Sequence, residues 1–502
     1  MTNTHNINKY SSQNKRKLLA KLLQEKVKKP HIFPMSFAQQ RLWFIDQLQL
    51  DNFAYQMQTA LRLTGFLNEV ALLKTINEVL RRHEVLRTAF GTMKGKPVQI
   101  IIPNLNLDLP TISLEELTDI EQEAEIKNLI LPEIQQPFDL RQAPLLQVTL
   151  LRLKETEHIL VFTIHHIVSD LWSMRILVEE VTVLYEAFSK DRPSPLGELP
   201  IQYADFAVWQ HQWLQGKVLQ TQLDYWKRQL GSTYPRLVFP KPPSRSSAES
   251  SRGAKQSFTL SKDLTEAIDL LSRQEGVTLF MTLLAVFQVL LHCFTGIGDI
   301  RVGSPIASRN RVEIEKLIGF FVNTLVLRID LSGNPSFREL LLRSRQVTLE
   351  AYAHQDLPFE KLVVELQPER NLNNNPLYQA WFVLQNVSIP RLELSGLSIT
   401  PFEVEKDTVR HDLLLEIRES SEGLRGRFEY KTDLFYEVSI SRLIEHFKTL
   451  VQHIVVQPDT TLHEIATMLT QSNEEQQRIQ KQELRVTERQ KLKMIKRKTI
   501  RK

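Results

Sequence analysis

The chain has 502 residues, 42% hydrophobic and 24% charged, a composition that can form the cores of about two to four domains and that excludes a disordered chain. Its single cysteine, Cys293, excludes an intramolecular disulfide framework and a cysteine-based zinc site, so we expect the reducing environment of the cytoplasm. The net charge of +5 is concentrated in the ends, because residues 1–30 and 473–502 each carry about +7, and the acidic body between them, at about −9, argues against nucleic-acid binding.

The two basic ends are expected to lie outside the folded body. Residues 1–30 are polar and lysine-rich and lack the apolar core of a signal peptide, so we predict a linker or docking segment rather than a secretion signal. Residues 466–502 form a basic tail, and its stretch 491–498 fits a docking helix for another protein and a solvated linker of a longer assembly equally well.

Two amphipathic helices and a strand hairpin are predicted in the first half of the chain. Asn68 is a suitable N-cap, and apolar residues spaced three and four apart mark one face of a helix that runs to about Arg82. Residues 144–153 and 158–164 are rich in Val, Leu, Ile and Thr and flank a charged turn, which predicts a hairpin. A second helix is expected to begin at Asp170, also a good N-cap residue.

Prolines mark the breaks between the predicted halves. Residues 190–200 carry three prolines and are the best candidate for a domain joint, and a second break lies at 235–253. Beyond it we expect a strand at 254–260, a helix at 264–274 and an apolar helix at 279–294 that is buried, since it contains polar residues and is too short for a membrane span.

Helical and strand patterns alternate along the whole chain without a repeat of fixed period. This pattern is typical of a mixed α/β protein. We predict two α/β lobes, residues 31–195 and residues 196–465, the second including the segment that connects the lobes. Ligand sites tend to form where two such lobes meet.

A histidine pair, His165 and His166, ends the predicted hairpin, and Asp170 follows four residues after the second histidine. Because side chains alternate across a strand, the two histidines are expected to point in different directions, with only one facing a cleft. A histidine can accept a proton from an attacking amine or hydroxyl, or orient it. Taken alone, such a pair is more often structural, and it lacks the spacing of a zinc site, so no metal is expected.

Six segments in a fixed order give this pair a context. They are Ser36–Trp43, Arg82–Phe90, Phe162–Asp170, Tyr203–Gln210, Ile318–Arg328 and His354–Glu360. These segments resemble the motifs of condensation domains of nonribosomal peptide synthetases, and the third resembles the HHxxxDG signature of that family. The resemblance covers about residues 33–462. The histidine pair argues against the cyclising relatives, and the order Leu171-Trp172-Ser173 after the signature is that of condensing rather than epimerising members.

The resemblance implies two chloramphenicol-acetyltransferase-like lobes in a V-shaped pseudo-dimer, with a tunnel between them. His166 would be the catalytic residue in this tunnel. Donor and acceptor carrier proteins would present phosphopantetheine arms from its two ends, and no other cofactor is implied. The reaction would join a carrier-bound acyl or peptidyl thioester to a carrier-bound amine.

Further residues are expected to support the site. His165 is predicted mainly to stabilise the fold. Asp170 is predicted to pair with an arginine, either Arg87 or Arg309, because a buried carboxylate without a partner is costly. Asn323 stands in an apolar stretch and needs hydrogen-bond partners, so we expect it either to line the cleft or to tie the two lobes together.

The chain departs from the family pattern at two places. Leu171 replaces the glycine that ends the signature, which leaves the donor class open. The seventh motif, expected at residues 369–378, is retained only in part. Two other functions stay open, a freestanding acyltransferase that uses a soluble amine or alcohol and a catalytically silent scaffold domain. No adenylation domain or carrier motif is recognised in the chain, so both substrates are expected to arrive on other polypeptides, unless the chain is an excised piece.

Overall fold

The computed structural model describes residues 30–48, 55–135, 137–233, 235–237, 239, 252–366, 377–385, 392–394, 396–402 and 409–471. Most of the predicted basic segments 1–30 and 466–502 lies outside the described residues, as do most of the seventh motif and most of the break at 235–253. Residues 466–471 are described, and they are helical, with Leu469 buried in the core of the C-terminal lobe, so this lobe extends beyond the predicted boundary at 465. The helices and strands, in chain order, are β1 (His31–Pro34), α2 (Phe37–Leu48), β2 (Gln56–Gly65), α3 (Glu69–Arg82), η3 (Glu84–Arg87), β3 (Thr88–Met93), β4 (Lys96–Ile101), β5 (Thr111–Ser113), α4 (Asp119–Gln135), β6 (Leu146–Lys154), β7 (Glu157–His165), η4 (His166–Val168), α5 (Leu171–Phe188), α6 (Tyr203–Trp213), α7 (Gly216–Leu230), β8 (Gly253–Ser261), α8 (Lys262–Gln274), α9 (Leu279–Thr295), β9 (Asp299–Ile306), α10 (Val312–Glu315), β10 (Asn323–Asp330), α11 (Phe337–Ala353), α12 (Phe359–Leu366), β11 (Ala380–Gln385), β12 (Leu392–Leu394), β13 (Leu397–Phe402), β14 (Leu413–Ser420), β15 (Gly423–Lys431) and α13 (Glu437–Ile454).

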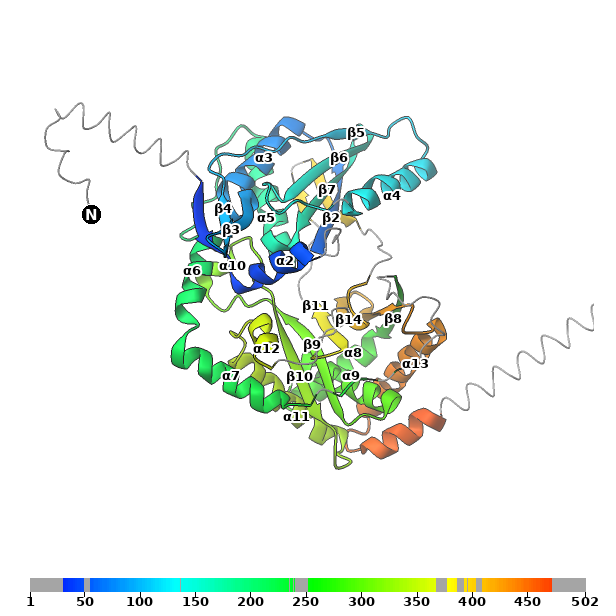
Figure 1. Cartoon of the computed structure of the whole chain (residues 1–502). Helices are drawn as coiled ribbons and strands as arrows, with labels where there is room; N and C mark the ends of the chain where they lie inside the picture. Colours follow the sequence, from blue (N-terminus) through cyan, green and yellow to red (C-terminus); the bar gives the residue numbers. More distant parts are fainter. Residues whose placement is uncertain are drawn as a thin grey trace, which may run out of the picture.

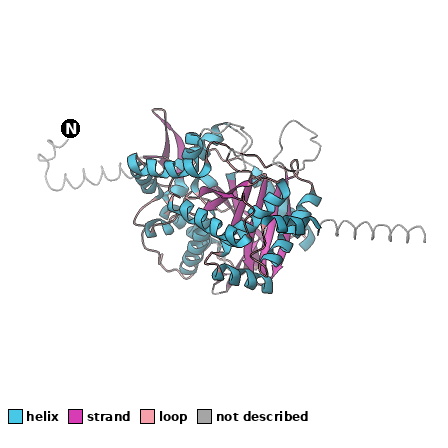
Figure 2. Cartoon of the chain, turned by 90° about the horizontal axis from the view of Figure 1, so that it is seen from below, coloured by secondary structure: helices cyan, strands magenta, loops and turns pink. Residues whose placement is uncertain are grey.

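Two lobes, each built on a six-stranded sheet, form the molecule (Figure 1). The N-terminal lobe holds the sheet β12-β13-β2-β7-β6-β5 and a small sheet, β1-β4-β3. The C-terminal lobe holds the sheet β10-β9-β11-β14-β15-β8. In the view from below, helices cover the strands (Figure 2). The predicted α/β architecture of two lobes is confirmed.

Local signals placed the helices and the hairpin of the N-terminal lobe correctly. The Asn68 side chain accepts a hydrogen bond from Ala71 N at 3.0 Å and so caps α3. Asp170 caps α5 in the same way, through Ser173 N at 2.8 Å. Strands β6 and β7 pair antiparallel as the predicted hairpin, and β7 ends at His165.

The apolar helix predicted at 279–294 is α9, and it forms the centre of the C-terminal lobe. Every residue of α9 from Met281 to Leu291 is buried, and the helix packs against α8, α11, α13 and the sheet. Among the described residues no single helix is long and apolar enough to cross a membrane, and only α8 with α9 passes that test as a pair, bent by 104°.

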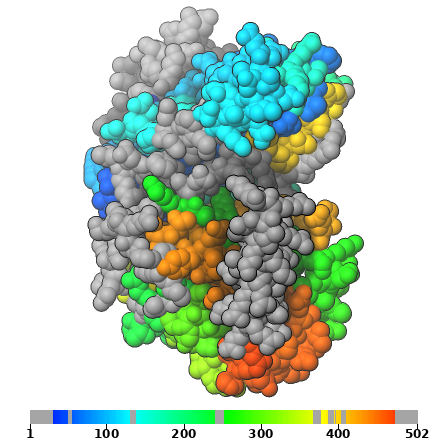
Figure 3. Space-filling view, turned by 90° about the vertical axis from the view of Figure 1, so that its right-hand side faces the viewer, coloured from blue at the N-terminus to red at the C-terminus, as the bar shows by residue number. Residues whose placement is uncertain are grey.

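The second half of the chain also contributes to the N-terminal lobe. Strand β13 pairs with β2, so that Leu397 lies opposite Gly65, and the yellow surface of this part lies beside the blue and cyan of the upper lobe (Figure 3). Gly65 has φ +130°, and a Cβ at this position would lie 2.0 Å from the carbonyl oxygen of Gly396. The sheet of the first lobe is therefore completed by residues beyond 196.

The chain passes between the two lobes at two further places, and one of them brings the second half of the chain to the end of β7 (Figure 1). The predicted joint at 190–200 links α5 to α6, and α6 and α7 then run from the upper lobe to the lower one (Figure 1). The connection between β9 and β10, residues 307–322, returns to the N-terminal lobe and is called the return segment below. Ile314, Leu317, Ile318 and Phe321 of this segment join the core of the N-terminal lobe. The residues that follow β7 are thus covered by the second half of the chain.

Candidate active site at His166

His166 lies directly after the end of β7, as the first residue of the 3-10 turn η4. Its Nδ1 donates a hydrogen bond to the carbonyl oxygen of Ser169, at 2.7 Å. Because a carbonyl oxygen can only accept, Nδ1 must carry the proton, and Nε2 then holds the lone pair of the neutral ring. The turn therefore leaves His166 with an Nε2 that can accept a proton.

His165 has the opposite tautomer and different surroundings. Its Nδ1 accepts a hydrogen bond from Ile167 N at 3.1 Å, so the proton of the neutral ring is on Nε2. The side chain is buried, and its ring lies edge-on to Phe138, 6.4 Å between centroids. The two histidines contact different partners, as predicted, but the reason is different. The chain leaves the strand after His165, so it is the turn rather than strand alternation that separates them.

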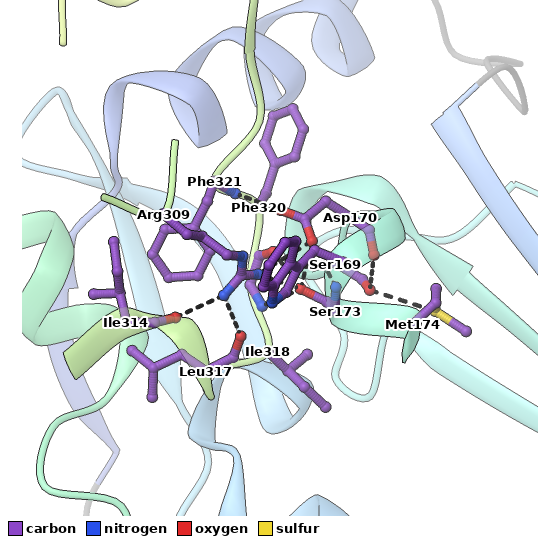
Figure 4. A network of polar contacts seen from close by, with 12 residues as sticks. Ser169, Asp170, Ser173, Met174, Arg309, Ile314, Leu317, Ile318, Phe320 and Phe321 are labelled. Carbon is purple, nitrogen blue, oxygen red and sulfur yellow. Dashed lines mark hydrogen bonds and ion pairs between the residues drawn. The ribbon is translucent and has the colours of Figure 1, made fainter. Parts of the chain in front are cut away.

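Asp170 is fully buried, and both of its carboxylate oxygens are bound (Figure 4). Oδ1 accepts from Ser173 N at 2.8 Å, from Ser173 Oγ at 2.7 Å and from Arg309 Nη2 at 3.1 Å. Oδ2 accepts from Phe321 N at 3.1 Å. The Asp170 side chain thus caps α5 and binds the return segment at Arg309 and Phe321. These bonds hold the return segment over the turn that contains His166.

Arg309 is the arginine that pairs with Asp170, and the alternative prediction of Arg87 is wrong. Besides the ion pair, Arg309 Nη1 donates to the carbonyl oxygens of Ile314 and Leu317, both at 2.7 Å, and the guanidinium lies 4.1 Å over the ring of Phe321. Arg87 instead donates to Ile102 O at 2.6 Å and to Glu84 at 3.3 Å. Arg309 therefore neutralises the charge of Asp170 and, through its bonds to two backbone carbonyls, fixes the local conformation of the return segment.

Burial and a nearby cation keep both histidines neutral. Burial, followed by the charge of Arg410, lowers the pKa of His166 to about 4, against the opposing effects of its bond to Ser169 and the charge of Asp170. Burial, His166 and Arg410 lower the pKa of His165 to about 3. At neutral pH the His166 imidazole is therefore uncharged, the form in which Nε2 can accept a proton.

The hydrogen bonds of Asn323 lie within the C-terminal half rather than between the two lobes, and its role in lining the cleft stays a prediction. Its Nδ2 donates to the carbonyl oxygens of Gln355 and Leu357, both at 2.8 Å, and its Oδ1 accepts from Phe359 N at 3.0 Å. These partners belong to the C-terminal half, so Asn323 fixes the start of α12 to β10. Its link to the other lobe is indirect.

The sequence analysis did not predict an ion pair that joins the two lobes. Arg41 on α2 binds Glu360, the second residue of α12, at 3.1 Å. Both residues stand in segments that carry the family resemblance, the first and the sixth. That was a usable signal, although no local pattern indicates that these two segments meet.

Tyr203 and Gly319 lie in the fourth and fifth segments that carry the resemblance, but no role was predicted for either residue. The Tyr203 hydroxyl donates to Phe320 O at 2.6 Å and lies 2.8 Å from Ser36 Oγ. A Cβ on Gly319 would lie 2.0 Å from Cδ2 of Tyr203, so only glycine allows the return segment to approach α6 so closely. Together they place Phe320, whose ring lies 4.8 Å from that of His166 at 63°.

The polar groups that act on His166 include the Ser169 carbonyl, the Asp170–Arg309 ion pair, the Arg410 guanidinium and the neighbouring neutral histidine. Within the described part of the chain, no group of three or more His, Cys, Asp and Glu side chains is arranged to hold a metal ion. A neutral imidazole with a free lone pair, held by such groups, suits the transfer of a proton or of an acyl group.

Known proteins resemble this chain both in sequence and in fold. The family described as "Condensation domain" matches residues 29–477. Linear gramicidin synthase of Brevibacillus parabrevis has a subunit that is 49% identical over 428 residues, which are 85% of this chain and 8% of that protein. Chondramide synthase cmdD of Chondromyces crocatus is 43% identical over 444 residues, 88% of this chain and 11% of that protein. The chain thus spans about a tenth of the length of these two relatives.

Solved structures share the two-lobed fold. The X-domain from teicoplanin biosynthesis superimposes with a TM-score of 0.78 at 24% identity and covers 87% of this chain and 98% of that chain. The first condensation domain of the calcium-dependent antibiotic synthetase, bound to a substrate analogue, gives 0.71 at 19% identity, with 86% and 98% covered. The SgcC5 protein of Streptomyces globisporus gives 0.69 at 27% identity, with 85% and 100% covered.

Proposed function

The chain belongs to the condensation-domain family, and from this premise we propose that it forms an amide bond at His166. The amine of an acceptor attacks the carbonyl carbon of an acyl or peptidyl thioester. A C–N bond forms, the C–S bond breaks, the thiol leaves, and the amine loses one proton. The observation that carries the proposal is the hydrogen bond from His166 Nδ1 to Ser169 O at 2.7 Å, because it leaves Nε2 as the acceptor for that proton.

Positioning is expected to contribute more to the rate than proton removal. An α-amine has a pKa of about 8, so a fair fraction of the acceptor is already neutral at physiological pH. Holding the amine and the thioester within attack distance can supply several kcal/mol, whereas general base help is typically about 10²- to 10⁴-fold. We assign His166 the task of orienting the amine through Nε2 and accepting its proton after attack.

Both substrates are proposed to arrive on the phosphopantetheine arms of donor and acceptor carrier proteins, through a tunnel between the lobes. Support comes from the relatives, which are synthases many times longer than this chain, and from the two-lobed fold, which places His166 where both halves meet. The division of the chain near residue 195 belongs to the same proposal, apart from the return segment and strands β12 and β13, which join the N-terminal lobe. So do the cytoplasmic location and the docking role of the two basic ends.

One assay tests this function. The protein is incubated with a carrier-bound acyl thioester and either a carrier-bound aminoacyl acceptor or the same amine in free form, and products are read by intact-protein mass spectrometry. We expect the amide product on the acceptor carrier and much less product with the free amine. Equal product with the free amine would favour a freestanding acyltransferase, and no product with either would favour a silent scaffold.

The pH dependence of this reaction should follow the amine rather than the histidine. The pKa of His166 is lowered, so its neutral, active form is lost only as the pH falls through about 4, and no loss is expected near its ordinary value of 6.5. Between pH 6 and 8 the rate should rise with pH as the acceptor amine loses its proton. Single-turnover rates across this range check the prediction, and a rate that falls by half near pH 6.5 and is level above pH 7 would contradict it.

A further inference from the structure

Phe320 is the residue of the return segment that contacts the candidate catalytic ring. Its phenyl ring lies edge-on to the imidazole of His166, with centroids 4.8 Å apart and an angle of 63° between the planes. The two residues come from different halves of the chain, because His166 follows β7 and Phe320 precedes β10. The contact therefore exists only when the return segment is seated on the N-terminal lobe.

The backbone around Phe320 is held at three consecutive residues. Gly319 N donates to Ser173 Oγ at 3.0 Å, Phe320 O accepts from the Tyr203 hydroxyl at 2.6 Å, and Phe321 N donates to Asp170 at 3.1 Å. A side chain on a backbone fixed in this way has little freedom beyond its own rotamer. These three bonds therefore fix the backbone from which the Phe320 ring extends toward His166.

Phe320 and Phe321 are adjacent phenylalanines with different surroundings. The Phe321 ring is buried under the Arg309 guanidinium and belongs to the core of the N-terminal lobe. The Phe320 ring points away from the Arg309 and Asp170 network (Figure 4). It is partly exposed and contacts the ring of His166. Phe321 is thus buried within this core, whereas Phe320 packs against the same core from a partly exposed position and contacts His166.

The contact has two physical consequences for His166. An aromatic edge against one side of the ring limits its rotation, and with Nδ1 bound to Ser169 O this fixes the direction of Nε2. The phenyl ring also excludes water from that side, and burial is the largest cause of the lowered pKa of His166. The charged groups that act on this ring are Arg410, which lowers the pKa, and Asp170, which raises it, and neutral His165 lies next to it in the chain.

We propose that Phe320 is a positioning residue for the reaction, which holds the His166 imidazole in the orientation that directs Nε2 to the substrate amine and keeps water from that ring. The expected effect on the rate of amide formation rests on the proposed function. The expected effect on the orientation and titration of His166 does not. Phe320 acts through His166, so it is not itself catalytic.

Two measurements on Phe320→Ala and Phe320→Tyr test the proposal. In the free protein with isotope-labelled histidine, the NMR titration of His166 should move upward in Phe320→Ala, from about 4 toward its ordinary value of 6.5. In single-turnover assays over a range of carrier concentrations, Phe320→Ala should lower the limiting rate of amide formation about 10- to 100-fold with little change in the half-saturating concentration, because orientation rather than binding is lost. Phe320→Tyr keeps the ring and should stay within about threefold of the parent.

Phe402→Ala is the matched control, since Phe402 is a partly buried ring on β13 that packs against Arg62 rather than against His166. It should leave the titration of His166 and the rate unchanged. A folded Phe320→Ala protein with the parent's titration and rate would overturn the proposal. If the parent itself forms no amide, the proposed function fails, while the NMR titration still decides whether Phe320 controls the imidazole.

Discussion

His166→Ala is expected to lower the single-turnover rate of amide formation about 10²- to 10⁴-fold or to abolish it, the largest loss of activity of any single substitution in the site. The substitution removes Nε2, the atom that would orient the amine and accept its proton. It also removes the bond to Ser169 O and the contact with Phe320, but His166 is only partly buried. The free energy of unfolding should therefore fall by about 1 kcal/mol, a shift of about 2–4 °C in Tm.

His165→Ala provides the matched comparison, because it deletes the neighbouring imidazole with the opposite tautomer. It leaves the buried Ile167 N without its acceptor, which typically costs about 1–3 kcal/mol, and it removes the packing against Phe138. We expect a clearly lower Tm and a rate near that of the parent at temperatures where the variant is folded. Amide formation and thermal unfolding are measured on both variants. A well-folded His166→Ala protein that makes product at the parent's rate would end the assignment.

Local patterns were sufficient for the elements that carry the site. Asn68 and Asp170 have side chains suited to capping, and each caps the helix that was predicted to follow it. The buried helix α9 followed from its length and composition, and the hairpin β6–β7 from its strand-forming residues. These signals lie within a few residues of the structure that they determine, so one sequence contains them completely.

Contacts between distant segments could not be predicted in the same way. Arg87 and Arg309 are equivalent as chemical partners for Asp170, and only the course of the return segment decides between them. The pairing of β13 with β2 depends on a crossing between lobes, and no hydrophobic period encodes such a crossing. The contact of Phe320 with His166 has the same origin, since it depends on where Asp170, Ser173 and Tyr203 hold the backbone.

Asp170→Ala is expected to be the most destabilising single substitution at the site. The fully buried carboxylate accepts hydrogen bonds from Ser173, Arg309 and Phe321, and its loss leaves the Arg309 guanidinium buried without its charge partner. Breaking a buried pair on one side typically costs about 3–5 kcal/mol. Since the return segment is held by the same carboxylate, activity should fall as well, even in the fraction of protein that is folded.

Graded substitutions separate the charge of Asp170 from its hydrogen bonds. Asp170→Asn can keep the acceptor that serves Ser173, but its amide NH₂ then faces Phe321 N, a second donor, so an intermediate loss of about 1–3 kcal/mol is expected. Arg309→Met in the Asp170→Ala background removes the unpaired charge, and the double variant should be less destabilised than the sum of the single ones. Urea unfolding of the parent, of Asp170→Ala, of Arg309→Met and of the double variant measures this coupling. If the two losses simply add, the two side chains are energetically independent and the ion pair does not hold the return segment in place.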